Sequence, residues 1–414
     1  MCQAKDLAQM RNRFRQIAVV LFFSICFLLV SHVFDVVPKS FKIPVVLLAL
    51  LGISLAASGR VFVFWQTAAG KIMPVFVAWV LLTWFLAGHT MDGRYYMQAF
   101  VVGAVLFAAA AGLLNTAADF SKLFMTLACA GVVAALLGVV WSGQHYGRFA
   151  LRMGAYADPN YYAMGLLAVM PLMWTTVARK ALWVRIAGLL AMALPLLLLV
   201  KTGSRAAVIS IVVMLVVLFL LSSLTARIVI GGLAAVAVVA LLAFVPNVLK
   251  SRLAPSDAQS AEQNSSAARQ TLLVTGLVMT LNNPLLGLGP GNFARAIVDE
   301  GRMRGEEYAP LGTHNAYTQI SSETGVPGII LFLLLIGFSI VKLVSLLRQT
   351  SANDELHELA RGMLLSLAGV CIFLFFLSEG YNPLVYLWLG LTTGLRRLLP
   401  EPEREIEEYE EIVS

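Results

Sequence analysis

The feature of this sequence that most restricts its fold is a series of long apolar runs. They lie at about residues 17–34, 43–58, 72–88, 97–114, 123–141, 161–177, 182–200, 206–223, 227–246, 316–347, 362–379 and 381–399. A helix needs about 20 apolar residues to cross a bilayer, with a lower limit of about 17. The runs are continuously apolar, whereas strands of a membrane β-barrel alternate between polar and apolar residues. The sequence therefore predicts an all-α, polytopic transmembrane bundle of about twelve spans.

The composition agrees with a protein that lies largely in lipid. Only 13% of the 414 residues are charged, against about 25% in soluble domains. The net charge is +7, but the basic residues are spread over many short loops. That distribution is typical of membrane orientation, so nucleic acid is not an expected partner. None of the four cysteines lies in the long polar stretch, so neither a disulfide framework nor a cysteine metal site is indicated.

The spans and loops divide the chain into four segments. Residues 1–246 hold spans one to nine, and residues 247–315 form a polar stretch that we expect to be a periplasmic catalytic loop. Residues 316–399 hold an interfacial helix and spans ten to twelve, and residues 400–414 form an acidic cytoplasmic tail. The run at 316–347 is too long for one straight span and contains Gly325, Pro327 and Gly328. We therefore expect a break there, with the true span starting at about residue 328.

The distribution of positive charge predicts the orientation. More than half of the 30 Lys and Arg residues fall on one side of the membrane if the N-terminus is cytoplasmic. Because short cytoplasmic loops are enriched in Lys and Arg, both termini are predicted to be cytoplasmic and the long loop to lie on the outer side. The N-terminal segment is basic and then apolar, without a small-residue cleavage site before Asp35. It is interpreted as a retained first span.

The long loop is predicted to contain two short helices joined by a glycine-rich turn. Ser265-Ser266 can cap a helix from Ala267 to Leu281, which stops at Asn282-Asn283-Pro284. The sequence GLGPGNF, residues 287–293, follows, and a second helix is expected before Arg302. The glycines either form a plain tight turn or let the backbone approach a substrate closely.

Five polar signatures fall on the outer face in this orientation. They are GAYADPNYYA at residues 154–163, KTGSRAA at residues 201–207, Arg269, GLGPGNF, and the pair His314-Asn315. Because the orientation rests on loop charge alone, this clustering is a partly independent indication of a site on that face.

Two outer arginines are candidates for binding an anion. Arg205 follows a tight Lys-Thr-Gly-Ser turn, where Ser204, free backbone N–H groups and a fixed guanidinium suit phosphate or pyrophosphate. The alternative is that Arg205 extends to lipid headgroups. Arg269 either contacts the same anion or is an exposed helix residue. Arginine on the outer side is disfavoured by the orientation rule, so a cluster of them favours function.

His314 is the candidate catalytic residue. It lies at the start of a predicted helix, whose positive end disfavours an imidazolium and keeps the ring able to accept a proton. A neutral histidine can act as general base towards a sugar hydroxyl. The alternative is a histidine that only satisfies the helix terminus. Asn315 either orients a substrate hydroxyl or caps the helix.

The remaining polar residues permit both structural and functional interpretations. Asp158-Pro159-Asn160 is most simply an N-cap and turn, although Asn160 is also a candidate substrate contact. Arg152 either steers an anion or faces solvent. The outer loops contain no HExxH sequence, cysteine pair or paired acidic motif, so we expect neither a metal nor a cofactor.

In their order and spacing these motifs resemble the O-antigen ligase superfamily, which includes O-antigen ligases, O-antigen polymerases and protein O-oligosaccharyltransferases. The resemblance rests on DPN before a span, TGSR in a short outer turn, Arg269, NPLLGLGPGNF, and HN followed by GVPG. It covers roughly residues 154–347, and the first five spans match only in hydropathy. The size and the single long outer loop look most like an O-antigen ligase.

The resemblance implies a glycosyl transfer at the periplasmic face of a bacterial inner membrane. The implied donor is O-antigen on undecaprenyl pyrophosphate, and the implied acceptor is the lipid A–core oligosaccharide. By motif matching, Arg205 and Arg269 would contact the donor pyrophosphate and His314 would be catalytic. The reaction would be independent of metal and would invert the anomeric carbon.

Three other functions remain open from the sequence. An O-antigen polymerase places the same demands on donor binding, although such enzymes often have two sizeable outer loops. A protein O-oligosaccharyltransferase often carries an added C-terminal domain. A lipid-linked glycan transporter would be expected to place charged groups near the bilayer midplane, whereas the interior runs here are almost free of charge.

Overall fold

The computed structural model describes residues 2–35, 43–88, 91–145, 148–152, 154–229, 231–232, 257–303 and 310–398. The expected acidic tail, 400–414, lies outside these residues, as does most of the expected ninth span. The helices of the first half are α1 (Cys2–Ser31), α2 (Ile43–Ala57), α3 (Ala68–Leu86), α4 (Met91–Leu113), α5 (Ala117–Val140), α6 (Pro159–Val177), α7 (Leu182–Lys201) and α8 (Arg205–Leu221). Those of the second half are α10 (Asp257–Asn282), α11 (Phe293–Met303), α12 (Ala316–Gln349), α13 (Glu355–Phe373) and α14 (Pro383–Arg396).

The described residues confirm an all-α, multi-pass membrane fold. Seven helices are long and apolar enough to cross a membrane: Asp6–Ser31, Ala68–Leu86, Gly93–Leu113, Ala117–Val140, Leu182–Lys201, Ala316–Gln349 and Glu355–Phe373. Two shorter apolar helices are Pro44–Ala57 and Arg205–Leu221. In the part of the chain that the structure describes, a two-stranded antiparallel hairpin, β1 (Ser142–His145) and β2 (Arg148–Leu151), is the only departure from helix among the regular elements. The predicted count of twelve spans is thus higher than the seven long apolar helices found among the described residues.

Two helices that were expected as spans, α6 and α14, are enclosed by other helices. Nearly every residue of both is buried, with α13 packed on α6 and α4 packed on α14. In this interior, tyrosine hydroxyl groups are buried and form hydrogen bonds with backbone carbonyl oxygens. The hydroxyl of Tyr162 donates to the carbonyl oxygen of Ala134, and that of Tyr386 donates to the carbonyl oxygen of Gly380. A helix packed on all sides by protein needs less apolar surface than one facing lipid.

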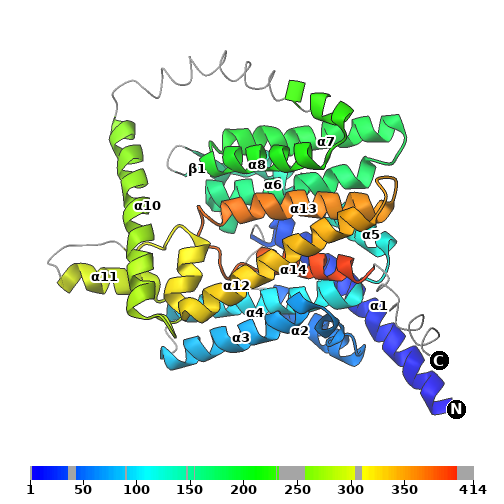
Figure 1. The fold of residues 1–414 in the computed structure, drawn as a ribbon, viewed down its shortest axis with the longest axis horizontal. Helices are drawn as coiled ribbons and strands as arrows, with labels where there is room; N and C mark the ends of the chain where they lie inside the picture. The colour runs from blue at the N-terminus through cyan, green and yellow to red at the C-terminus, as the bar shows by residue number, and fades with distance from the viewer. Residues whose placement is uncertain are drawn as a thin grey trace, which may run out of the picture.

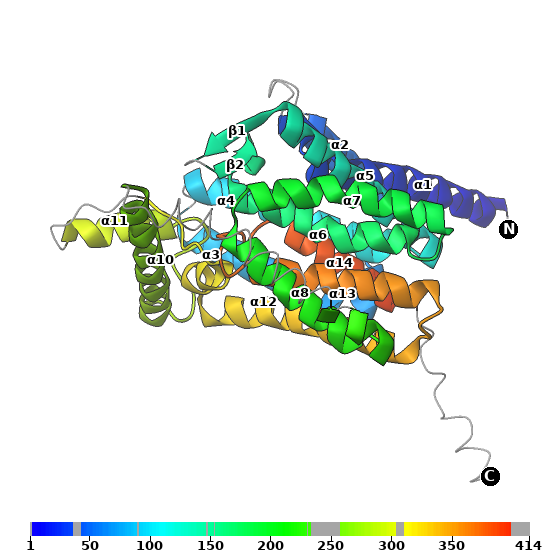
Figure 2. The ribbon, with the colours of Figure 1, turned by 90° about the horizontal axis from the view of Figure 1, so that it is seen from above.

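The bundle helices run roughly side by side, and α10 crosses one end of them (Figure 1). The turned view places α11 beyond α10 at that same end, with the start of α1 at the other end (Figure 2). The bundle therefore has two ends that differ: α10 and α11 lie at one end, and the start of α1 lies at the other.

The predicted break in the long run lies at Gly325, inside α12. Its φ of 72° is left-handed, so the helix is interrupted there. The carbonyl oxygens of Ser322 and Glu323 accept hydrogen bonds from the backbone N–H groups of Leu288, at 2.9 Å, and Gly289, at 2.8 Å. The glycine-rich turn thus serves a structural purpose, because it supplies donors to carbonyl groups beside the break.

The first helix of the long polar segment is longer than expected. It begins at Asp257 rather than Ala267, so Ser265-Ser266 lie inside α10 and are not its cap. The residues before the serines are rich in Ala, Gln and Glu, which have good helix propensity. The expected second helix is present as α11. Leu272 and Met279 of α10 pack with Phe293 and Ile297 of α11 in a small cluster outside the main core.

Candidate functional site at one end of the bundle

Asn160 joins three elements at the end of the bundle crossed by α10. Its Oδ1 accepts hydrogen bonds from Arg148 Nη2 of the hairpin and from Ser204 Oγ, each at 2.9 Å. Ser204 is the N-cap of α8 and accepts from the N–H of Ala207. Arg148 Nε also donates to the carbonyl oxygen of Thr202, at 2.9 Å. This network holds the turn before α8, and it therefore also positions the backbone of Arg205, the first residue of α8.

Asp158 is the N-cap of α6, as the sequence predicted. Its Oδ1 accepts from the N–H groups of Asn160, at 2.7 Å, and Tyr161, at 3.1 Å. The exposed carboxylate also acts on its charged neighbours: it raises the pKa of Arg269 and of His314. The cap is therefore part of the electrostatic environment of the candidate site.

Arg205 and Arg269 form a pair of cations without a counter-ion within hydrogen-bonding distance among the described residues. Burial lowers the pKa of Arg269, and the charge of Arg205 lowers it further, while Asp158 acts in the opposite direction. Among the described residues, neither guanidinium makes a hydrogen bond or an ion pair with a protein group. Two adjacent guanidinium groups that repel each other are suited to bind an anion with several oxygens.

His314 lies in a strained turn immediately before α12. Its φ is 50°, which is left-handed and uncommon for a residue other than glycine. The N–H of His314 donates to Ser378 Oγ at 2.7 Å. Asn315 caps the helix, because its Oδ1 accepts from the N–H groups of Tyr317 and Thr318. The capping interpretation of Asn315 is thus confirmed, and that oxygen has two protein donors.

The imidazole of His314 is half-buried and makes no hydrogen bond to a described side chain or backbone group. Burial lowers its pKa, Arg269 lowers it further, and Asp158 raises it. The neutral form is therefore favoured, as expected. The principal cause is burial, whereas the sequence argument relied on the helix terminus.

The sequence analysis missed the loop between α13 and α14. In this loop Ser378 holds His314, and the N–H of Gly380 donates to Gln319 Oε1 at 3.0 Å. Glu379 Oε2 accepts from Asn382 Nδ2 at 2.7 Å. Burial raises the pKa of Glu379 to about 7, Asn382 opposes this, and Asp158 adds to it. The sequence feature that could have revealed this loop is the polar segment SEGYN between two apolar runs. The segment is short, so hydropathy averaged over the length of a span hides it.

The candidates divide into two groups. Arg205, Arg269 and His314 form the first group, because the charge of Arg205 lowers the pKa of Arg269 and the charge of Arg269 lowers that of His314. Ser204 and Asn160 are engaged with protein partners that position the site. Arg152 is exposed, and its Nε donates to the carbonyl oxygen of Ser142 at 2.8 Å, so the hairpin holds it.

The comparisons with known proteins point to one family. Residues 188–333 match the family model described as O-Antigen ligase. The matched segment includes Arg205, Arg269 and His314. A comparison with the curated proteins finds no match. Over these residues the chain is therefore similar to the O-antigen ligase and polymerase superfamily of glycosyltransferase-like membrane proteins.

Proposed function

We propose that the protein is an O-antigen ligase, which transfers O-antigen from undecaprenyl pyrophosphate to the lipid A–core oligosaccharide. The observation that carries the proposal is the pair of guanidinium groups, Arg205 and Arg269, which have no counter-ion among the described residues, with Arg269 acting on the half-buried imidazole of His314. An anionic leaving group and an acceptor hydroxyl require these two kinds of side chain. The family match supports a lipid-linked glycan as substrate.

In this reaction the arginines bind the donor and stabilise the departing group. The acceptor oxygen forms a bond to the anomeric carbon while the bond from that carbon to the pyrophosphate oxygen breaks. Undecaprenyl pyrophosphate leaves with the electron pair, and its growing negative charge is stabilised by Arg205 and Arg269. A single displacement inverts the anomeric carbon. The pyrophosphate is already an activated leaving group, so the proposal requires neither a nucleotide sugar nor a metal.

His314 removes the proton from the acceptor hydroxyl. The low pKa of the imidazole ensures that the base is neutral when the acceptor binds. Asp158 raises that pKa and therefore stabilises the imidazolium that forms during transfer. The proton passes to solvent after product release. Asn315 caps the helix through Oδ1, and its side-chain amide group is proposed to donate to the acceptor sugar.

The family match supports a bacterial inner-membrane location, and the positive-charge bias supports cytoplasmic termini and a site on the outer, periplasmic side. Ligase and polymerase use the same kind of donor and differ in the acceptor. Only one loop of this chain is long and polar, and this favours the ligase. The long loop, residues 247–315, contributes Arg269 and His314 to the proposed site.

Complementation distinguishes the two acceptors. The chain and its His314→Ala variant are expressed in a strain without a ligase and, separately, in one without a polymerase, each supplied with matched O-antigen genes. A ligase restores O-antigen on lipid A–core in the first strain only, as a ladder on a gel, and the variant does not at equal membrane expression. Polymerised O-antigen in the second strain, without transfer in the first, would contradict the ligase assignment.

A further inference from the structure

A cavity lies beside the second half of α12 and the last turns of α14, whereas His314 precedes the first residue of α12. Its volume is about 650 Å³, and it is lined by the start of α3, the middle of α12 and the end of α14. Thr392, the first residue of α14 in the cavity lining, follows the Asn382 cap beside Glu379 by ten positions, a rise of about 15 Å along the helix. The cavity is therefore separate from the proposed transfer site.

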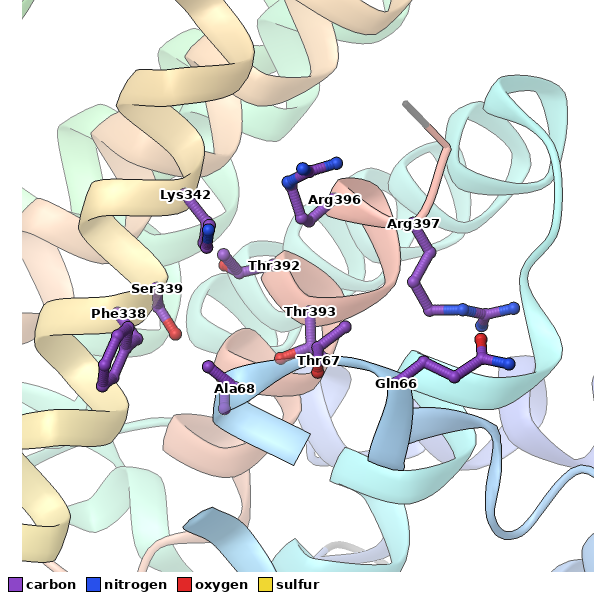
Figure 3. A pocket seen from close by; sticks show the side chains of 11 residues that line it. Gln66, Thr67, Ala68, Phe338, Ser339, Lys342, Thr392, Thr393, Arg396 and Arg397 are labelled. Atoms are coloured by element: carbon purple, nitrogen blue, oxygen red, sulfur yellow. The ribbon is translucent and has the colours of Figure 1, made fainter. Parts of the chain in front are cut away.

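Three basic side chains line this cavity, and none of the described lining residues is acidic. They are Lys342 of α12, and Arg396 and Arg397 at the end of α14 (Figure 3). In the described part of the chain, Lys342 and Arg396 have no ion pair or hydrogen bond with a protein group. Arg397 donates to the carbonyl oxygen of Ala111, and Arg60 brings a further positive charge near it.

Neutral donors add to these charges. Thr67 caps α3, with its hydroxyl accepting from the N–H of Gly70 at 3.0 Å. Ala68 and Ala69 line the cavity in the first turn of α3, where backbone N–H groups have no partner within the helix. The hydroxyls of Ser339 and Thr393 donate to carbonyl oxygens of their own helices, so their protons are already used.

The lining thus offers the backbone N–H groups of the first turn of α3 and three positive charges. The charge bias between the two membrane sides accounts for basic residues at this end of the molecule, but it does not require them to surround a cavity. The volume lies within the range of about 300–1,000 Å³ that is usual for small-molecule sites. Such a space accommodates a phosphate together with part of the group that carries it.

We propose that this cavity binds a phosphate-bearing anion, either the headgroup of an anionic phospholipid or a soluble phosphoester. Lys342 and Arg396 provide the principal charges, and the first turn of α3 provides backbone donors. This inference is independent of the proposed transferase activity, because it uses none of the residues around His314.

The test measures binding to the purified full chain. Phosphatidylglycerol retained by the detergent-solubilised protein is quantified by native mass spectrometry, with phosphatidylcholine as reference lipid. Inorganic phosphate and glycerol 3-phosphate are titrated separately, with the melting temperature as readout. Each probe is also applied to a chain ending at Pro400, because glutamates follow from Glu401 and can compete for the cations.

The cavity variant is Lys342→Gln with Arg396→Gln. The matched control, Arg179→Gln with Arg348→Gln, removes the same charge from exposed residues outside the cavity lining. We expect the cavity variant to weaken binding about tenfold or more, since two charge-assisted contacts are lost, while the control binds as the wild type does. Lys342→Arg with Arg396→Lys keeps the charges and should retain most of the binding, which separates loss of ligand from loss of folding.

The probe that binds identifies the source of the phosphate. Binding of phosphatidylglycerol that depends on the cavity residues supports a lipid headgroup, and binding of glycerol 3-phosphate or phosphate alone supports a soluble ligand. Tighter binding on removal of the tail supports a site that the tail occupies in competition. Absence of binding in both chain lengths, or equal binding by the cavity variant and the control, would overturn the proposal.

Discussion

The N–H of His314 donates a hydrogen bond to Ser378 Oγ at 2.7 Å, across 64 positions of sequence. The φ of His314 is 50°, and a left-handed conformation of this kind costs energy that the surrounding contacts must offset. The loop between α13 and α14 therefore holds the backbone from which the imidazole extends. A positioning role for Ser378 follows from this geometry.

Replacing Ser378 with alanine is expected to lower kcat about five- to tenfold with little change in the donor KM. The variant removes the hydrogen bond from the N–H of His314, worth about 1 kcal/mol, and the one between the hydroxyls of Ser378 and Thr313, without touching the anion-binding pair. Ser378→Thr retains the hydroxyl and should recover most of the rate. A raised KM with unchanged kcat would show that Ser378 contributes to substrate binding instead.

The charges around His314 predict shifts of opposite sign in its titration. Its pKa lies below the ordinary 6.5, so the neutral base predominates above that pH and the acid limb of kcat falls below it. Arg269→Gln removes a charge that lowers the pKa and should raise it. Asp158→Asn removes a charge that raises the pKa and should lower it further.

These shifts are measured by NMR titration of protein labelled at its histidines and held in lipid nanodiscs. The sequence contains five histidines, so the His314 signal is assigned by its absence from the His314→Ala spectrum. Shifts in the same direction for both variants, or no shift for either, would mean that these two charges do not control the imidazole.

Loss of either unpaired arginine is expected to impair transfer strongly. Arg205→Gln and Arg269→Gln should each lower kcat about 10²- to 10³-fold, the range found when a preorganised group that stabilises developing charge is removed. Lysine at either position should recover only part, because it lacks the bidentate geometry of guanidinium. The control is Arg295→Gln, on the exposed side of α11 beside Asp299. An equal loss in this control would indicate a general charge requirement.

The break in α12 predicts a sharp difference between two glycines of one helix. A Cβ at Gly325 would lie 2.2 Å from the carbonyl oxygen of Leu285, and its φ of 72° is unfavourable for alanine. A Cβ at Gly337 would meet nothing within 4 Å. Gly325→Ala should therefore abolish accumulation of folded protein, while Gly337→Ala should not. Fluorescence-detected size exclusion measures both, and equal behaviour of the two would contradict the packing described.

Local features of the fold were predictable from the sequence because they depend on neighbouring residues. Asp158 before a proline specifies an N-cap, and glycine beside proline specifies the break in α12. The start of α10 was predicted wrongly, because paired serines resemble a cap even where the preceding residues continue the helix. The enclosed helices α6 and α14 also show that apolar length does not tell lipid-facing helices from buried ones.

The candidate site was predictable in its charged residues but not in its supporting contacts. Outer arginines and a histidine at a helix start are visible as residue types that membrane segments disfavour. The hydrogen bond from Arg148 to Asn160, and that from His314 to Ser378, depend on tertiary packing that residue patterns do not encode. The loop that contains Glu379 was missed because it is short and lies between two apolar runs.

The most direct test of the account is transfer by purified protein in nanodiscs, from undecaprenyl-pyrophosphate-linked O-antigen to lipid A–core, without nucleotide sugar or added metal. Wild type and His314→Ala are compared at matched amounts, with donor binding measured in parallel. The account predicts transfer by the wild type, a loss of about 10²-fold or more in the variant, and unchanged donor affinity. Normal transfer by His314→Ala would contradict the role assigned to this histidine.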